Sequence, residues 1–461
     1  MSDPCLGDIS AERRRLIQEG ELDIAETAQY LATLPASRFA SLAYQNQPAR
    51  PYLQPRGGFP GLPKQRALAV ALSQAGADFL PLTIDSHTRH NDYAAAAELL
   101  ATGTAGDRDL LNGYPLVSHP VADTRALFAD LPQPVSLRHG TPDARLLAEY
   151  ALAAGITEIE GGGLCYTLPY ARSYPLDRAL AHWQYVDRLC AIAGPPGRPI
   201  HRESFGPLTA TLVPPVITIA VQLCELLLAA EQGVRSFAVS FAQTGSVEQD
   251  AALAQVLRSQ AGRLLARFGF PDVRVSLVYH QWMGAFPAEP ALAWQLIAIS
   301  TAISRLIGAD KLVIKTADEA GGIPSIDSNV AAVRAVRYVL AMFPNGCSVA
   351  GPVLEQERAL IDGEVSHLIE RVLAQHPTSL LAAVHHSVLA GIIDVPFAPH
   401  EQNAGGLITD RGPDRRIRIL EPGAVPIRPD DLRTERQLLG TRSTEQGPLW
   451  ERLLHDVRIL A

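Results

Sequence analysis

The chain has 461 residues, of which 47% are hydrophobic and 19% charged, so it can form a large folded core and is not expected to be disordered. Its 40 basic and 48 acidic residues give a net charge of −8 without a basic block, which argues against nucleic acid or an anionic membrane as a partner. No apolar run reaches the roughly 20 residues of a membrane helix, the first residues do not resemble a signal peptide, and the 5 cysteines are widely scattered. We therefore expect a cytoplasmic protein with reduced thiols.

Residues 1–50 are predicted to form an N-terminal helical segment. Leu16, Ile17, Leu22 and Ile24 lie among acids and arginines, as on one face of an amphipathic helix. A proline-rich stretch follows them.

Residues 51–390 are predicted to form a catalytic domain of the α/β class, because short β-branched runs alternate there with helical stretches. The runs that resemble strands are 79–85, 114–119, 134–139, 157–160, 199–204, 236–241, 273–280 and 311–316. The helical stretches 141–155 and 214–233 begin at prolines and end at glycines. About eight such units favour a closed (β/α)8, or TIM, barrel over an open sheet. Residues 391–461 are predicted to be a C-terminal extension packed on the barrel.

Unusual polar residues gather where these strands end, which is the face that carries the chemistry of TIM barrels. They are Arg89, Arg138, His139, Glu160, Arg202, Glu203, His280, Lys315 and Glu319. A single arginine at such a place is explained by an ordinary loop salt bridge, but several arginines on one face imply an anionic ligand between them. Arg56, among glycines, adds a further cation. Three cations and the carboxylate of Glu160 would suit an acidic amino acid, which has two carboxylates and one ammonium group.

Other chemistries have weaker signals. Asp85, His87 and His90 could form a metal site, as could the pair His385–His386, but a hydrogen-bonded loop explains the first set better and we predict no metal. Gly161–Gly163 lack a neighbouring Lys, Ser or Thr for phosphate binding, and Cys165 lacks a nearby base. Tyr166 and Tyr170 could either bind a ligand or pack on a helix. Difficult chemistry in such a site usually comes from a cofactor.

A series of segments resembles the large (epsilon) chain of glutamate mutase, also called methylaspartate mutase. They are DFLPLTIDSHTRHNDY, LLNGYPLV, RHGTPDARLLAEYALAAG, EGGGLCYTLPYA, HWQYVDRL, RESFGPLTATLVPP, LLAAEQGV, HQWMGAFP and KTADEAGGIP. They follow in unbroken order from about residue 54 to 405, and the remainder is related more loosely.

The resemblance implies an isomerase, an intramolecular transferase that uses adenosylcobalamin to interconvert L-glutamate and L-threo-3-methylaspartate in a TIM barrel. In the family a small, sigma-type chain holds the cobalamin and supplies its cobalt-ligating histidine from a D-x-H-x-x-G motif. This chain has DSHTRH at residues 85–90, with His90 in place of the glycine, so it is expected to be inactive alone. A heterotetramer of two large and two small chains is the family expectation.

Site residues follow from the resemblance position by position. Those implied to bind the substrate are Arg56, Arg89, Arg138, His139, Glu160, Tyr166 and Tyr170, with the catalytic Glu160 facing the amino group. Those implied to contact the cofactor are Gly58, Asn112, Pro169, Phe286, Lys315, Glu319 and Ile323. Lys315 and Glu319, one helical turn apart, would hold a ribose and its hydroxyls.

The implied mechanism is a radical one. A 5′-deoxyadenosyl radical removes hydrogen from C4 of glutamate, and the substrate radical fragments into a glycyl radical and acrylate, which recombine at another carbon. Glu160 would favour the fragmentation by accepting the ammonium proton.

Several positions depart from the family pattern. Cys165 and Thr167 replace Ser and Asn, Ala317 and Asp318 replace a Pro-His pair, and SFAQTGS replaces a Gly-Tyr-Gly stretch. They motivate one alternative, a diverged mutase that acts on another acidic amino acid in secondary metabolism. A second alternative is a non-catalytic paralogue that binds acidic amino acids, although none of the site residues is lost.

Overall fold

Eight short parallel strands form the centre of the molecule in the computed structural model, which describes residues 11–17, 22–45, 49–105, 108–208, 212–343, 346–440 and 449–460. In spatial order they are β1 (Tyr52–Gln54), β10 (Lys311–Val313), β9 (Arg274–His280), β8 (Ser236–Ala242), β7 (His201–Glu203), β6 (Glu158–Glu160), β5 (Val135–Arg138) and β2 (Leu80–Thr83). The ring closes between its end strands through backbone hydrogen bonds, from Phe79 N to Leu53 O (3.1 Å) and from Thr83 N to Gly57 O (3.0 Å). The predicted TIM barrel is confirmed.

One predicted strand is absent from the structure, and one strand of the barrel was not predicted. Residues 114–119 form no strand: Tyr114 makes one bridge to Ile84, and the 3-10 helix η2 (Leu116–Ser118) follows. Prolines at 115 and 120, which lack the N–H needed for a ladder, explain the failure. Strand β1 was missed because it has only three residues and lies between Pro51 and Pro55. The expected number of barrel strands was right: seven of the eight predicted strands are present, and β1 stands in place of the one predicted at 114–119.

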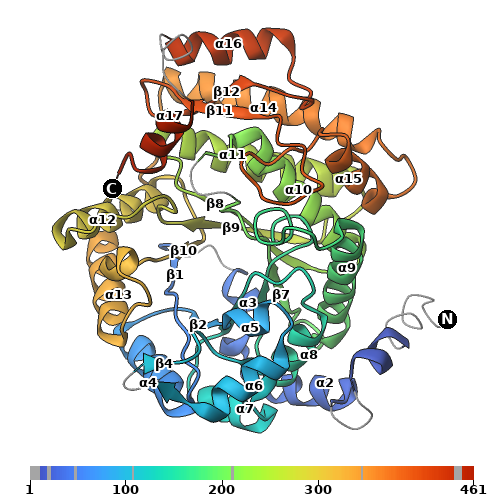
Figure 1. Cartoon of the computed structure of the whole chain (residues 1–461), viewed down its shortest axis with the longest axis vertical. Helices are drawn as coiled ribbons and strands as arrows, with labels where there is room; N and C mark the ends of the chain where they lie inside the picture. Colours follow the sequence, from blue (N-terminus) through green and yellow to red (C-terminus); the bar gives the residue numbers. More distant parts are fainter. Residues whose placement is uncertain are drawn as a thin grey trace.

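A ring of helices surrounds the strands, seen end-on in Figure 1. Its members are α4 (Leu62–Ala75), α7 (Val121–Phe128), α8 (Arg145–Ala153), α9 (Leu176–Ala193), α10 (Pro215–Glu231), α11 (Val247–Arg267), α12 (Pro290–Leu306) and α13 (Ile326–Ala341). Smaller elements are η1 (Ala36–Arg38), α3 (Ala40–Ala43), α5 (Ser86–Arg89), α6 (Tyr93–Thr102), β3 (Thr104–Ala105), β4 (Arg108–Asp109) and η3 (Ala317–Ala320). None of the described helices is long and apolar enough to cross a membrane.

The ends of the chain pack on the outside of this ring. In the N-terminal segment α2 (Ile24–Thr33) contacts α8 and contains Ile24 of the expected amphipathic helix, while Leu22 precedes it; residues 1–10, 18–21 and 46–48 lie outside the described ranges. At the other end, α14 (Pro352–Leu373) and α15 (Leu380–Leu389) cover α10. Every residue of α10 from 215 to 230 is buried, which explains why its sequence is apolar on all sides.

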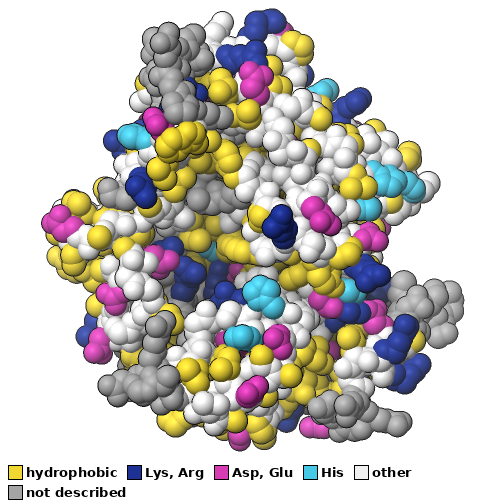
Figure 2. Space-filling view, viewed as in Figure 1, with side chains coloured by type: hydrophobic (Ala, Val, Ile, Leu, Met, Phe, Trp, Pro, Cys, Tyr) yellow, Lys and Arg dark blue, Asp and Glu magenta, His cyan; other side chains and the backbone are white. Residues whose placement is uncertain are grey.

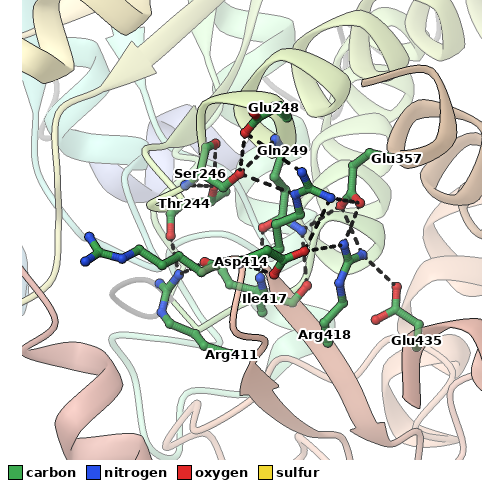
Figure 3. A network of polar contacts seen from close by, with 12 residues as sticks. Thr244, Ser246, Glu248, Gln249, Glu357, Arg411, Asp414, Ile417, Arg418 and Glu435 are labelled. Atoms are coloured by element: carbon green, nitrogen blue, oxygen red, sulfur yellow. Dashed lines mark hydrogen bonds and ion pairs between the residues drawn. The ribbon is translucent and has the colours of Figure 1, made fainter. Parts of the chain in front are cut away.

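A small C-terminal layer completes the fold beyond α14. It contains the antiparallel strands β11 (Ile408–Arg411) and β12 (Ile417–Glu421) and the helices α16 (Pro429–Leu439) and α17 (Leu449–Val457). A buried polar network, drawn in Figure 3, joins this layer to the barrel helices. Arg418 of β12 pairs with Glu357 of α14 at 2.6 Å and with Glu435 of α16 at 3.4 Å, while Gln249 of α11 accepts a hydrogen bond from Ile417 N.

Substitution of Arg418 by methionine is expected to destabilise the chain by about 3–5 kcal/mol, because the buried carboxylates of Glu357 and Glu435 would lose their shared cation, and Arg416, 3.6 Å from Glu357, would compensate only in part. Denaturant unfolding measures the difference. The matched control is Arg433→Met, which removes an exposed ion pair with Asp430 and should change stability little. Equal stability of the two variants would contradict a stabilising role for the network.

Candidate functional site

A cavity of about 200 Å³ opens at the carboxyl ends of the barrel strands. In Figure 2 dark-blue basic side chains gather in a hollow near the middle of this face. The lining residues are Arg56, Thr83, Ser86, Arg89, His90, Arg138, His139, Gly140, Glu160, Tyr170, Phe205, His280 and Met283. The structure therefore brings all three predicted substrate arginines into one cavity with His139, Glu160 and Tyr170.

Local structure determines which side chains reach this cavity. Side chains alternate across a strand, so Arg138 at the end of β5 and Glu160 at the end of β6 face the barrel axis, whereas Leu137 and Ile159 face the helices. Arg89 reaches the cavity from α5, whose first turn is capped by Asp85: its carboxylate accepts hydrogen bonds from His87 N (2.9 Å) and Thr88 N (3.0 Å).

The three arginines differ in how they are engaged. Arg138 is buried and forms ion pairs with Glu160 and, at 3.5 Å, with Glu203. Arg56 is partly exposed and pairs with Glu319 at 3.1 Å. Arg89 donates through Nε to Ile84 O at 2.6 Å, and no carboxylate in the described part of the chain pairs with it. A dianionic ligand would thus meet one guanidinium, that of Arg89, without a carboxylate partner among the described residues, and two, those of Arg56 and Arg138, that already form ion pairs.

Glu160 is a buried carboxylate with an unusual proton affinity. Its pKa is raised to about 7, mainly by burial and also by the nearby charge of Glu203, against the opposing effect of Arg138. The hydroxyl of Tyr166 donates a hydrogen bond to Glu160 Oε1. Near neutral pH this group can therefore both accept and release a proton.

His139 is held as a neutral ring beside the arginines. Its Nδ1 accepts a hydrogen bond from Thr141 N at 3.1 Å, so Nε2 carries the proton. Burial, followed by the charge of Arg89, lowers its pKa to about 3. The ring stacks on Trp183 with centroids 5.8 Å apart. His139 therefore lines the cavity as a neutral ring and not as an additional cation.

The two tyrosines occupy different positions. Tyr166 is fully buried and reaches the site through Glu160, whereas Tyr170 lines the cavity and is 48% exposed. Their rings meet edge to face at 5.9 Å, and both contact Phe205. The two readings left open from sequence are therefore not exclusive, because the rings pack while the Tyr166 hydroxyl takes part in the polar site.

The predicted cofactor residues lie around the same strand ends. Lys315 forms the expected ion pair with Glu319, and its Nζ lies 5.8 Å from the centre of the Phe286 ring. Burial and then the charge of Arg56 lower the pKa of Lys315 to about 8. Ile323 is 58% exposed, and Pro169 precedes the exposed Tyr170.

Two further residues of this set have structural roles in the protein. Gly58 is buried, and a Cβ there would lie 2.1 Å from Thr83 O, so only glycine allows this loop to approach β2. Asn112 accepts a hydrogen bond from Ser86 N at 2.8 Å.

A family model and the similar curated proteins agree on one family. The family model of the methylaspartate mutase E chain matches residues 34–458. The glutamate mutase epsilon subunit of Haloarcula marismortui is 39% identical over 93% of this chain and 87% of its own length. The corresponding values are 36%, 95% and 91% for Desulfitobacterium hafniense and 36%, 98% and 96% for Escherichia coli O157:H7. The chain belongs to the glutamate mutase epsilon subunit family.

This epsilon-family chain also has a polar layer inside the barrel that the sequence analysis did not identify. Below the cavity, Lys311 of β10 is fully buried and binds Gln54 of β1, Glu158 of β6 and Glu203 of β7. Barrel interiors are usually filled by branched apolar residues, so these charges are exceptional. Two features of the sequence could have indicated this layer. Glu158 and Glu160 are two positions apart in TEIE and so face the same side of a strand, and Lys311 is one of only three lysines in the chain.

The structure of this epsilon-family chain corrects the expectation for Arg202 and explains why residue 162 is a glycine. Arg202 does not line the cavity, because it alternates with Glu203 and points outward to Asp187 of α9 at 2.6 Å. Gly162 is needed for packing, since a Cβ would lie 2.3 Å from Glu225, whose carboxylate accepts a hydrogen bond from Cys165 N at 2.9 Å. Within the described ranges, no group of three or more His, Cys, Asp and Glu side chains could hold a metal.

Proposed function

We propose that this chain is the catalytic large subunit of an adenosylcobalamin-dependent glutamate mutase that interconverts L-glutamate and L-threo-3-methylaspartate. The observation that carries the proposal is the single cavity shared by Arg56, Arg89, Arg138 and Glu160. The names of the relatives support the reaction, and the charges in the cavity support the substrate.

The cavity complements an acidic amino acid group by group. Guanidinium groups bind carboxylates through paired hydrogen bonds, so the arginines provide places for both substrate carboxylates. Glu160 provides the partner for the ammonium group. On binding, the substrate exchanges partners with the protein: its ammonium takes Glu160, and one of its carboxylates takes the place of Glu160 on Arg138.

The residues at the mouth of the barrel fit a bound nucleoside. Lys315 supplies a buried donor and Glu319 a partly exposed acceptor for ribose hydroxyls, and Phe286 supplies an apolar surface beside them. Bound adenosylcobalamin would supply the organic radical that removes a hydrogen atom from the substrate. The protein's part is to hold the nucleoside through Lys315, Glu319 and Phe286, close to the substrate cavity.

The remaining tasks belong to this chain's own residues. The arginines hold both parts of a substrate that is cleaved and rejoined, and such positioning can contribute about 7–11 kcal/mol to a reaction barrier. Glu160 accepts a proton from the substrate ammonium at Oε1 or Oε2 while Tyr166 keeps the carboxylate oriented. Phe205 and Met283 line the cavity with apolar surface, which limits access of water to reactive intermediates.

The proposed partner is a small cobalamin-binding, sigma-type subunit, in a heterotetramer of two large and two small chains. In support, the D-x-H-x-x-G motif is absent from DSHTRH, where Asp85 caps α5. The exposed side chains of Ile323 and Tyr170 provide apolar contact surface near the strand ends.

Reconstitution tests the proposed function directly. The purified chain is mixed with a small cobalamin-binding subunit of the family, adenosylcobalamin and L-glutamate. We expect 3-methylaspartate by NMR and an electron paramagnetic signal from cob(II)alamin coupled to an organic radical, with no product when either chain is omitted. Turnover of a different acidic amino acid but not of glutamate would favour the diverged mutase, and binding of glutamate without turnover would favour the non-catalytic paralogue.

A further inference from the structure

Glu203 is a buried carboxylate beneath the cavity, and none of the roles predicted from the sequence uses it. It lies at the end of β7, beside Glu160 in the sheet register, and is fully buried. Its Oε2 binds Lys311, while its Oε1 lies 3.5 Å from Arg138 Nη1 and 3.9 Å from His280 Nε2. Glu203 thus connects the polar layer of the barrel interior to the substrate cavity.

The charges of this buried group do not balance. Three carboxylates (Glu158, Glu160 and Glu203) face two cations (Arg138 and Lys311), and each side chain is at most 7% exposed. The neighbouring histidines do not compensate, because burial holds the pKa of His201 at about 3 and that of His280 well below its usual value. Within these five residues one negative charge is left over, which a proton on Glu160, the substrate ammonium or the guanidinium of Arg89 in the same cavity can offset.

Substrate binding would change the partners of Arg138 in this group. When a substrate carboxylate displaces Glu160, Glu203 is the remaining carboxylate in contact with Arg138. Lys311 holds Glu203 from below, and its Nζ also lies 2.9 Å from Glu158 Oε1. A partner fixed in this way can keep the Arg138 fork in place during the exchange.

We propose that Glu203 is a positioning residue for substrate binding, which anchors Arg138 as Glu160 passes from the arginine to the substrate ammonium. This inference rests on the proposed function and extends it to the barrel interior. The charge of Glu203 has a second effect, because it raises the pKa of Glu160 and so makes Glu160 a stronger base. The titratable and charged groups that surround Glu160 and Glu203 are Arg138, Tyr166, Lys311, Glu158, His280, Arg56, Arg89, His139 and Tyr170.

The test compares Glu203→Gln with Glu158→Gln in the reconstituted complex. Both substitutions remove one buried charge from Lys311, but only Glu203 contacts Arg138. For Glu203→Gln we expect the KM for L-glutamate to rise about ten-fold, as for the loss of one charged hydrogen bond. We also expect the acidic limb of the kcat/KM profile to move to lower pH by about one unit. Glu158→Gln should change neither, although thermal unfolding should show that both variants are destabilised.

Each outcome decides the proposal. If the two variants share the same KM and pH profile while the wild-type complex forms 3-methylaspartate, the role of Glu203 is refuted and the proposed function stands. If the wild-type complex has no activity toward glutamate, the proposed function fails and this inference fails with it. Should Glu203→Gln not fold, Glu203→Asp keeps the charge but retracts it from Arg138; a raised KM with an unshifted profile is expected, and an unchanged KM would overturn the proposal.

Discussion

Replacement of Arg138 by methionine is expected to lower kcat/KM for L-glutamate by about 10³-fold. The substitution removes a fork that can bind a substrate carboxylate, and it leaves the buried carboxylates of Glu160 and Glu203 without their shared cation. Removing one partner of a buried, hydrogen-bonded charge pair typically costs about 2–5 kcal/mol of binding free energy, a range that includes this loss of kcat/KM. Steady-state kinetics of the reconstituted complex measure the effect.

Two further variants separate recognition from stability. Arg138→Lys keeps the charge but not the planar fork, so it should preserve the fold while the KM remains raised. Arg418→Met, far from the cavity, should lose stability without any change in KM for glutamate. A normal KM in Arg138→Met would show that this arginine does not bind the substrate.

Replacement of Glu160 by glutamine is expected to lower kcat by about 10³-fold and to weaken glutamate binding less than ten-fold. Glutamine retains the size and a hydrogen-bond acceptor for the ammonium group but cannot take its proton, and proton transfer by a positioned group typically contributes about 10²–10⁴-fold. Single-turnover kinetics and calorimetric titration of glutamate measure the two quantities separately. Equal losses in turnover and binding would refute the role of Glu160 as a base.

The role of Glu160 as a base also predicts how kcat/KM changes with pH. Because burial raises the pKa of Glu160 to about 7, the wild-type kcat/KM should fall as pH decreases below this value, where Glu160 becomes protonated and can no longer accept a proton. Glu160→Gln should lose this limb of the profile. Tyr166→Phe is the matched control, since it removes the hydrogen bond to Glu160 but leaves the carboxylate, and should retain the limb.

The sequence was most informative where one physical rule controls several elements at once. Alternation of apolar runs and helices predicted the barrel, because parallel strands need long crossover connections and are covered on both faces. The same rule places the carboxyl ends of all the strands on one face, so the sequence alone predicted that the side chains of Arg89, Arg138 and Glu160 lie together. Pro115 and Pro120 show the limit of the method, since an apolar run between prolines resembles a strand but cannot pair as one.

Contacts between distant segments could not be predicted in this way. Arg56 and Glu319 are 263 positions apart and were assigned to the substrate and to the cofactor, yet they form an ion pair with each other. The outward orientation of Arg202 depends on the alternation phase of a three-residue strand, which is too short to show a pattern. The charged barrel interior contradicts the usual apolar filling, so hydrophobicity offered no reason to expect Lys311 there.

The burial of Arg138, Glu160, Glu203 and Lys311 has a consequence for the solutions in which the protein can work. At 0.1 M salt, dissolved ions largely screen the attraction between exposed charges that lie more than about 10 Å apart, but they act much less on charges that water does not reach. The buried part of the cavity, around Arg138 and Glu160, is therefore expected to keep its affinity for a charged substrate at high ionic strength. Sensitivity to ionic strength is confined to the rim, where the side chain of Arg56 is 38% exposed.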